Sequence, residues 1–195
     1  FSQDDNADAV CIEKIRIAVK RNKVDGFIMG EVWKNPMRMG RGYISSGKCM
    51  DTVMNYPLID ALLRYYKYAD CNKLDYIIRD ILREYPEETI NSLMNFTSTH
   101  DISRAINYFT DENEFNEYAE WAWDLKNNDL NYLKNKKLSK EEYEKAKEKY
   151  KSYLFALYFL LFLNSFLNSS IFSSMFMSSN ILFLKSFTAS LNVWP

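Results

Sequence analysis

Apolar residues recur every three to four positions in residues 9–22, 58–69 and 74–85. This spacing places them on one face of a helix, so we predict three amphipathic helices. Cations toward the end of the first stretch suit the negative end of a helix dipole. The apolar positions that define the three faces are Val10, Ile15, Val19, Leu58, Leu62, Tyr66, Leu74, Ile78, Ile81 and Tyr85.

Three shorter apolar segments lie between these helices. Residues 26–30 read GFIMG, residues 50–56 read MDTVMNY and are closed by Pro57, and residues 90–96 read INSLMNF. They lack a clean alternation of apolar and polar positions, which is typical of parallel strands buried on both faces. We therefore predict three strands, the first of them fully buried, with a glycine-rich loop at residues 40–49.

Further helices are predicted at residues 102–109, 117–128 and 138–150. The last begins with Ser139 followed by Glu142, the spacing of a capping box. Strands alternating with helices indicate a parallel α/β fold. Their spacing is typical of a β/α barrel, but only about three units are present, whereas a full barrel needs eight and roughly 250 residues. We predict a partial TIM barrel over residues 1–150 of this 195-residue chain.

The composition changes sharply at residue 151. The tail, residues 151–195, is rich in Phe, Leu, Ser and Asn, and no charge appears between Lys151 and Lys185. One interpretation is a frameshift, because an A/T-rich coding sequence read out of frame gives such residues. The alternative is a membrane segment within residues 152–184, where about 20 uncharged residues could cross a bilayer core of ~30 Å. Embedded Asn and Ser residues weaken that alternative.

Charge and cysteine content narrow the class of protein. A net charge of -1 gives no electrostatic reason to expect nucleic acid as a partner. Three cysteines without C-x-x-C spacing argue against a disulfide framework or a zinc site. Residue 1 is Phe and no signal-peptide pattern follows, so we expect a piece of a longer, cytoplasmic chain, with a membrane location through the tail as the alternative.

Carboxylates follow the first and third predicted strands. Glu31 comes directly after GFIMG and stands two residues before Trp33, and Asp101 follows His100 shortly after the third strand. In β/α barrels the active site lies at the carboxyl ends of the strands, which makes these residues candidates for chemistry. The plainer interpretation is that Glu31 bonds to a neighbouring loop and that His100 is a structural hydrogen-bonding residue.

The segments GEVW, MDTVMNYPL and LMNFTSTHDISR, in this order, carry a more specific signal. Together they resemble the α-amylase family, glycoside hydrolase family 13, and most closely its neopullulanase and cyclomaltodextrinase branch. The resemblance covers roughly residues 10–150 and implies strands five to seven of the catalytic barrel. An unrelated α/β scaffold in which these motifs coincide by chance is the remaining alternative.

The resemblance implies roles for five residues. Glu31 matches the general acid/base, and Asp101 matches the carboxylate that stabilises the transition state. His100 matches the histidine that bonds the same sugar ring. Trp33 would form an apolar wall or stack on a sugar, with packing inside the loop as the alternative. Arg104 matches an arginine after the His-Asp pair, with a solvated charge at a helix start as the alternative.

The implied reaction is retaining hydrolysis of an α-glucan oligosaccharide or starch-like substrate, at α-1,4 bonds or, as a second option, α-1,6 bonds. It requires a nucleophilic Asp, but the matching position falls on Ser2, and neither Asp4 nor Asp5 follows an Arg. We therefore expect this chain by itself to be inactive. No cofactor is expected, although calcium binds some members of the family. The alternative function is a non-catalytic, membrane-associated barrel fragment.

Overall fold

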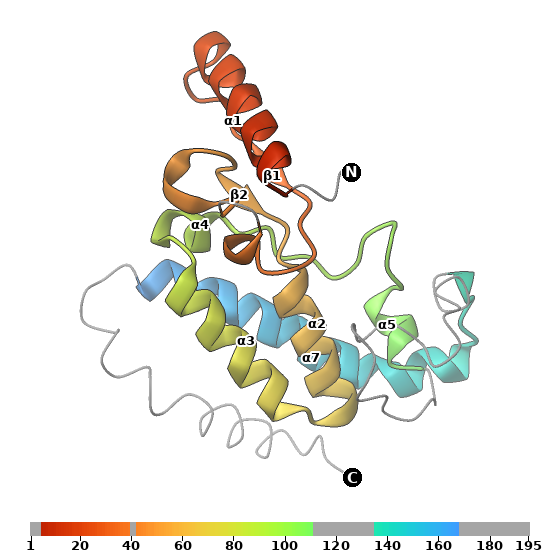
Figure 1. Ribbon diagram of the computed structural model, residues 1–195. Helices are drawn as coiled ribbons and strands as arrows, with labels where there is room; N and C mark the ends of the chain where they lie inside the picture. The colour runs from red at the N-terminus through yellow and green to blue at the C-terminus, as the bar shows by residue number, and fades with distance from the viewer. Residues whose placement is uncertain (1–4, 40–41, 111–134, 168–195) are drawn as a thin grey trace. The chain divides into compact units, whose positions relative to one another are not determined.

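The computed structural model describes residues 5–39, 42–110 and 135–167 (Figure 1). The chain divides into two compact units. Residues 1–59 and 76–96 form the first unit, and residues 60–75 and 97–195 form the second. Each unit is described by itself.

A small parallel sheet lies in the first unit. Strand β1 (Met29–Gly30) pairs in parallel with β2 (Thr52–Val53), with Met29 opposite Thr52. An isolated parallel bridge joins Met54 to Met94. The predicted parallel order of the three segments is therefore confirmed, although each regular strand is only two residues long.

The prediction that residues 26–30 are fully buried is wrong. Phe27 is 60% exposed and Met29 is 46% exposed, whereas Gly30 is buried. Side chains of a strand point alternately to its two faces. Residues 27 and 29 thus point to a face that the described residues leave open, and an apolar run alone cannot distinguish this arrangement from burial on both faces.

The third predicted strand is helical in its first three residues and forms only one bridge. Helix α4 (Glu87–Ser92) takes the first three residues of the segment, and Met94 alone forms a bridge. Pro86 precedes the helix with φ -59°, and Glu87 and Glu88 occupy its first turn. Proline geometry and acidic residues at a helix start both favour a helix there, so these local preferences shorten the strand.

The three predicted helices are confirmed as α1 (Asp5–Asn22), α2 (Tyr56–Tyr68) and α3 (Cys71–Glu84), although Ile15, on the predicted apolar face of α1, is 51% exposed. Both α2 and α3 begin earlier than predicted, because polar side chains cap them. The Leu58 N–H donates to Asn55 Oδ1 at 3.4 Å, and the Lys73 N–H donates to Asp70 Oδ1 at 3.1 Å. Pro57 is accommodated because the first turn of a helix needs no N–H there.

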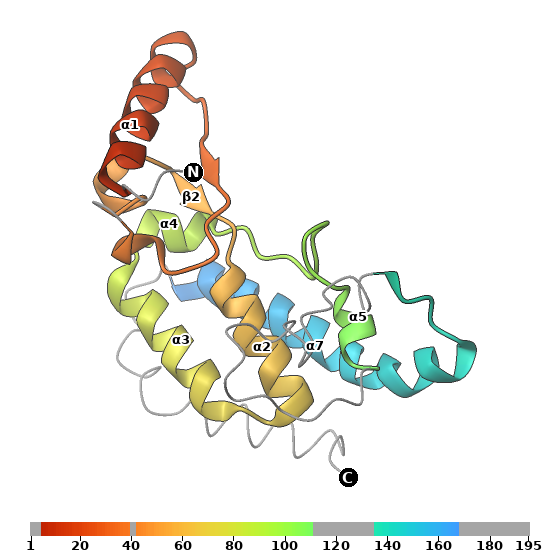
Figure 2. The ribbon, with the colours of Figure 1, turned by 45° about the vertical axis from the view of Figure 1, so that its right-hand side comes forward.

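The second unit contains α5 (Ala105–Tyr108) and the long helix α7 (Lys140–Leu167), both labelled in Figures 1 and 2. The capping box is confirmed: the Ser139 N–H donates to Glu142 Oε2 at 2.9 Å, and the Glu142 N–H donates to Ser139 Oγ at 3.2 Å. Helix α5 is shorter than residues 102–109, because Arg104 is extended at ψ 136°. The helix predicted at residues 117–128 lies outside the described residues.

Helix α7 runs without a break through residue 151, where the composition changes. Tyr153, Ala156 and Leu157 are buried, and the Tyr153 ring packs edge-on against those of Tyr66 and Phe109. The tail therefore contributes core side chains at its start. No helix within residues 5–39, 42–110 and 135–167 is long and apolar enough to cross a membrane.

Candidate functional site

Glu31 begins the loop that leaves β1. Its Oε1 accepts two hydrogen bonds, from Trp33 Nε1 at 3.2 Å and from the Tyr56 hydroxyl at 2.9 Å. Glu31 itself is exposed. The loop and the start of α2 thus present a solvent-accessible carboxylate whose orientation is set by two aromatic donors.

The two donors belong to a stack of aromatic rings. The ring centroids of Trp33 and Tyr56 lie 4.5 Å apart, and the ring planes are nearly parallel, with an angle of 13° between them. The Tyr56 side chain is fully buried, and its ring also packs edge-on against the Phe96 ring, with 4.9 Å between the ring centroids. Such pairs add about 0.5–1.5 kcal/mol each beyond area burial, so the ring stack gives Trp33 a defined position beside Glu31.

Tyr56 is a site residue that sequence reasoning missed, because residues 50–56 are predicted as a strand and none of them is given a role at the site. A signal was available. Tyr56 follows β2 closely, and the carboxyl ends of neighbouring parallel strands meet at one edge of a sheet. The argument that selected Glu31 after the first strand therefore applies equally to a hydroxyl after the second.

His100 and Asp101 lie together in the second unit. His100 Nε2 is 3.2 Å from Asp101 Oδ2, and their side chains are 86% and 38% exposed. The Asp101 N–H donates to Thr99 Oγ1 at 3.2 Å. Arg104 is exposed and directly precedes α5. The structure therefore forms two groups, Glu31 with Trp33 and His100 with Asp101, each within its own unit.

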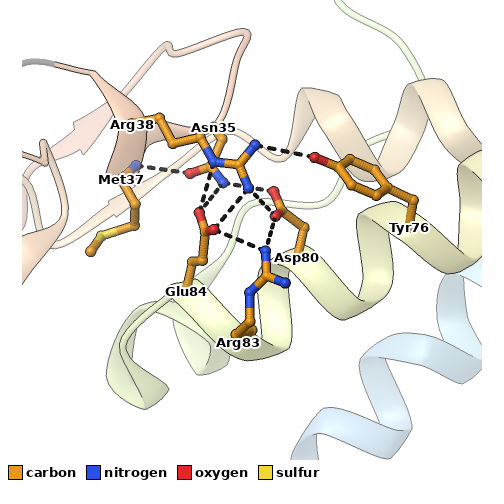
Figure 3. Close-up of polar contacts among 7 residues, drawn as sticks. All are labelled: Asn35, Met37, Arg38, Tyr76, Asp80, Arg83 and Glu84. Atoms are coloured by element: carbon orange, nitrogen blue, oxygen red, sulfur yellow. Dashed lines mark hydrogen bonds and ion pairs between the residues drawn. The ribbon is translucent and has the colours of Figure 1, made fainter.

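The loop after Trp33 is fastened to α3 by a polar network (Figure 3). Asn35 Nδ2 donates to Asp80 Oδ2 and to Glu84 Oε2, both at 2.7 Å. Its Oδ1 accepts from the Met37 N–H at 2.9 Å, which caps the 3₁₀ turn η1 (Pro36–Arg38). One asparagine thereby orders the turn and ties it to the helix.

Arg38 forms ion pairs with the same two carboxylates, those of Asp80 and Glu84. Its Nε and Nη2 reach the two oxygens of Glu84 at 3.1 and 2.8 Å, the geometry of a bidentate pair. Nη2 also bonds Asp80, and Nη1 donates to the Tyr76 hydroxyl at 3.1 Å. Arg83, from α3 itself, reaches both carboxylates at 3.0 Å.

These contacts shift the acid–base behaviour of the network. The hydrogen bond from Arg38 is the main cause that lowers the pKa of Glu84 to about 2. The hydrogen bond to Glu84, with a smaller one to Tyr76, raises the pKa of Arg38. Both groups are therefore ionised at every pH at which the chain would ordinarily be handled.

Glu84→Gln is expected to change the acid sensitivity of the first unit. A carboxyl with a depressed folded pKa stabilises the fold above its unfolded pKa of 4.5, and this stabilisation is lost as pH falls toward about 2. The melting temperature of the variant should thus lie below that of the wild type at pH 6, and the gap should close between pH 4.5 and 2. Thermal unfolding followed by circular dichroism checks this, and a gap that is constant with pH would contradict it.

No group of three or more His, Cys, Asp or Glu side chains that could hold a metal ion occurs in the part of the chain that the structure describes. The geometry of the site is therefore that of a hydrogen-bonded carboxylate beside stacked rings.

Comparison with known proteins finds sequence similarity to enzymes over about half of the chain. No family model matches the chain. It is 35% identical over 95 residues to a cyclomaltodextrinase from Geobacillus thermopakistaniensis (strain MAS1), covering 48% of this chain and 15% of that protein. It is 30% identical over 95 residues to a cyclomaltodextrinase from a Bacillus species, covering 48% and 16%.

Solved structures of the cyclic α-maltosyl-(1→6)-maltose hydrolase from Arthrobacter globiformis are also similar. The ligand-free form matches with a TM-score of 0.46 at 23% identity, and the complex with cyclic α-maltosyl-(1→6)-maltose matches with 0.47 at 22%. Both matches cover 53% of this chain and 23% of theirs.

The resemblance to glycoside hydrolases of the α-amylase family is thus confirmed over about half of the chain. Within that family the curated relatives are cyclomaltodextrinases, the branch that the motifs indicated. The chain spans about one sixth of the length of these relatives.

Proposed function

We propose that this chain is a part of a retaining α-glucan hydrolase and forms the fifth to seventh strands of its catalytic barrel. The substrate class is an oligosaccharide or starch-like glucan joined by α-1,4 bonds, with α-1,6 bonds as a second option. One observation carries the proposal: the carboxylate of Glu31, in the GEVW segment, accepts hydrogen bonds from Trp33 and from Tyr56 of the MNYPL segment. The similarity to cyclomaltodextrinases supports the substrate class.

Glu31 is the proposed general acid and base. In a retaining glycosidase one carboxylic acid protonates the leaving oxygen while a second carboxylate forms the glycosyl-enzyme, and the first then activates water. Both donors to Glu31 end on Oε1. A proton on Glu31 would therefore reside on Oε2, the oxygen free to meet the glycosidic oxygen, while Trp33 offers a ring face to the sugar.

Asp101 is the proposed stabiliser of the oxocarbenium-like transition state, with His100 bonding the same sugar and Arg104 assisting. The His100–Asp101 contact of 3.2 Å supports their action as a pair. The nucleophile is the part we propose to be missing. Ser2 and Asp4 lie outside the described residues, and Asp5 begins α1. No cofactor is invoked for this reaction.

The proposal is tested by adding maltotriose to the isotopically labelled chain and following tryptophan indole signals by NMR. The chain has four tryptophans, and Trp33→Phe identifies the signal of Trp33. We expect maltotriose to move that signal, because Trp33 adjoins the proposed acid. Cellotriose, which has the same size and β-linkages, is the matched control and should move nothing.

Incubation of the same chain with a cyclomaltodextrin tests the proposal that the nucleophile is missing. We expect no release of reducing ends above the blank, since Glu31 alone cannot form the covalent intermediate. Turnover by the isolated chain would overturn the proposed inactivity.

In the NMR experiment, equal shifts of the Trp33 signal with maltotriose and cellotriose, or no shift with either, would overturn the assignment of an α-glucan site.

A further inference from the structure

The polar network behind the site joins two segments that are distant in sequence. Asp80 and Glu84 lie one turn apart on α3, and their partners Asn35 and Arg38 come from the loop that carries Glu31 and Trp33 (Figure 3). All of these residues belong to the first unit. The network is thus a built contact between a loop and a helix within one compact unit.

Taken by itself, helix α3 is not stabilised by the carboxylates of Asp80 and Glu84. Asp80 and Glu84 lie in its last turns, where a negative charge opposes the helix dipole. The Asp80 side chain is only 6% exposed, and a buried carboxylate is costly unless it is paired. Arg83 from the same helix supplies part of the compensation, and the loop supplies the rest.

The loop is held on both sides of the proposed acid. On one side, Gly30 pairs with Val53 in the sheet. On the other side, Asn35 and Arg38 form hydrogen bonds with the carboxylates of α3. The Tyr43 N–H also donates to the Pro36 carbonyl, within the 3₁₀ turn, at 2.9 Å. Only residues 31–34 remain between the two anchors, which leaves the chain little freedom around Glu31 and Trp33.

We propose that Asn35 and Arg38 are positioning residues: by fastening the loop to Asp80 and Glu84, they hold Trp33 on Tyr56 and its indole N–H on Glu31. We call the contact of Asn35 and Arg38 with Asp80 and Glu84 the brace. Its role in catalysis rests on the proposed function, but its geometry does not. In this proposal Asn35 and Arg38 act through the loop that carries the acid.

The test compares two arginines that bind the same two carboxylates from opposite sides. Arg38→Gln removes the loop anchor, and Arg83→Gln removes an arginine that belongs to the helix itself. Hydrogen exchange of the Trp33 indole N–H, measured by NMR on the full chain, reports the bond to Glu31. We expect Arg38→Gln to speed this exchange by about tenfold or more, because it removes the charge-assisted hydrogen bonds of Arg38 and each typically contributes at least about that factor. We expect Arg83→Gln to leave it unchanged.

A structural role alone would give a different result. If the two arginines only neutralised Asp80 and Glu84, both variants would speed exchange alike, or both would lower the melting temperature with no effect on the Trp33 signal. Either result would overturn the proposal. Arg38→Lys keeps the charge without the planar fork, so its exchange rate should fall between those of the wild type and Arg38→Gln.

Salt provides a measurement that needs no variant, should Arg38→Gln fail to fold. The Arg38 side chain is 48% exposed, so its ion pairs are screened as ionic strength rises. Exchange of the Trp33 indole should therefore quicken with added sodium chloride, while the circular dichroism spectrum stays constant. Salt-independent exchange would contradict the brace. Because neither measurement uses sugar, the brace can hold even if maltotriose fails to bind, and the two proposals fail separately.

Discussion

Replacement of Asp60 with Asn is expected to lower the free energy of unfolding by about 3–5 kcal/mol. Arg64 Nε donates to Asp60 Oδ2 at 3.2 Å one turn along α2, and the two side chains are 6% and 1% exposed. Neutralising the carboxyl removes the negative charge that the buried guanidinium contacts. The desolvation penalty of that cation, more than the loss of one hydrogen bond, sets the size of the effect.

Urea unfolding followed by circular dichroism measures this change, and α7 offers a control of the same spacing. Glu141 and Lys145 are also four residues apart, but their side chains are 79% and 73% exposed. Glu141→Gln should therefore cost less than about 1 kcal/mol. The double variant Asp60→Asn/Arg64→Met removes both charges and should recover much of the loss. Equal effects of Asp60→Asn and Glu141→Gln would contradict the burial argument.

Much of this architecture could be predicted from local signals. Apolar spacing identified α1, α2 and α3 because a helix covers one face every 3.6 residues. The capping box at Ser139 and Glu142 formed with both of its hydrogen bonds, since the motif is complete within four residues. The nearness of Trp33 to Glu31 also follows from sequence, because the two share one short loop.

Features that depend on distant partners could not be predicted in the same way. The pattern of residues 26–30 says that Phe27 and Met29 are apolar, but exposure depends on what covers that face. Asp80 and Glu84 look like ordinary charges on a helix surface, and only the fold brings Arg38 to them. The apolar residues of the segment INSLMNF favour a strand, yet the helix start after Pro86 brings residues 90–92 into α4.

Truncation of Tyr56 is expected to have the largest effect on the candidate site. Tyr56→Ala should lower the free energy of unfolding by about 3–5 kcal/mol, the usual cost of deleting a fully buried aromatic side chain. It should also free the Trp33 ring, which loses the parallel partner 4.5 Å away. Urea unfolding measures the first effect, and exchange of the Trp33 indole N–H measures the second.

Tyr56→Phe separates the hydroxyl from the ring. This variant keeps the stack on Trp33 and the edge contact with Phe96 but removes the donor 2.9 Å from Glu31. Glu31 is exposed, so water can replace that donor, and the loss of stability should be only about 1 kcal/mol. If Tyr56→Phe destabilised the chain as much as Tyr56→Ala, the hydroxyl and not the ring stack would hold the loop. The expected order, with Ala far worse than Phe, would instead show that the rings place Trp33 and that the hydroxyl serves to orient the carboxylate of Glu31.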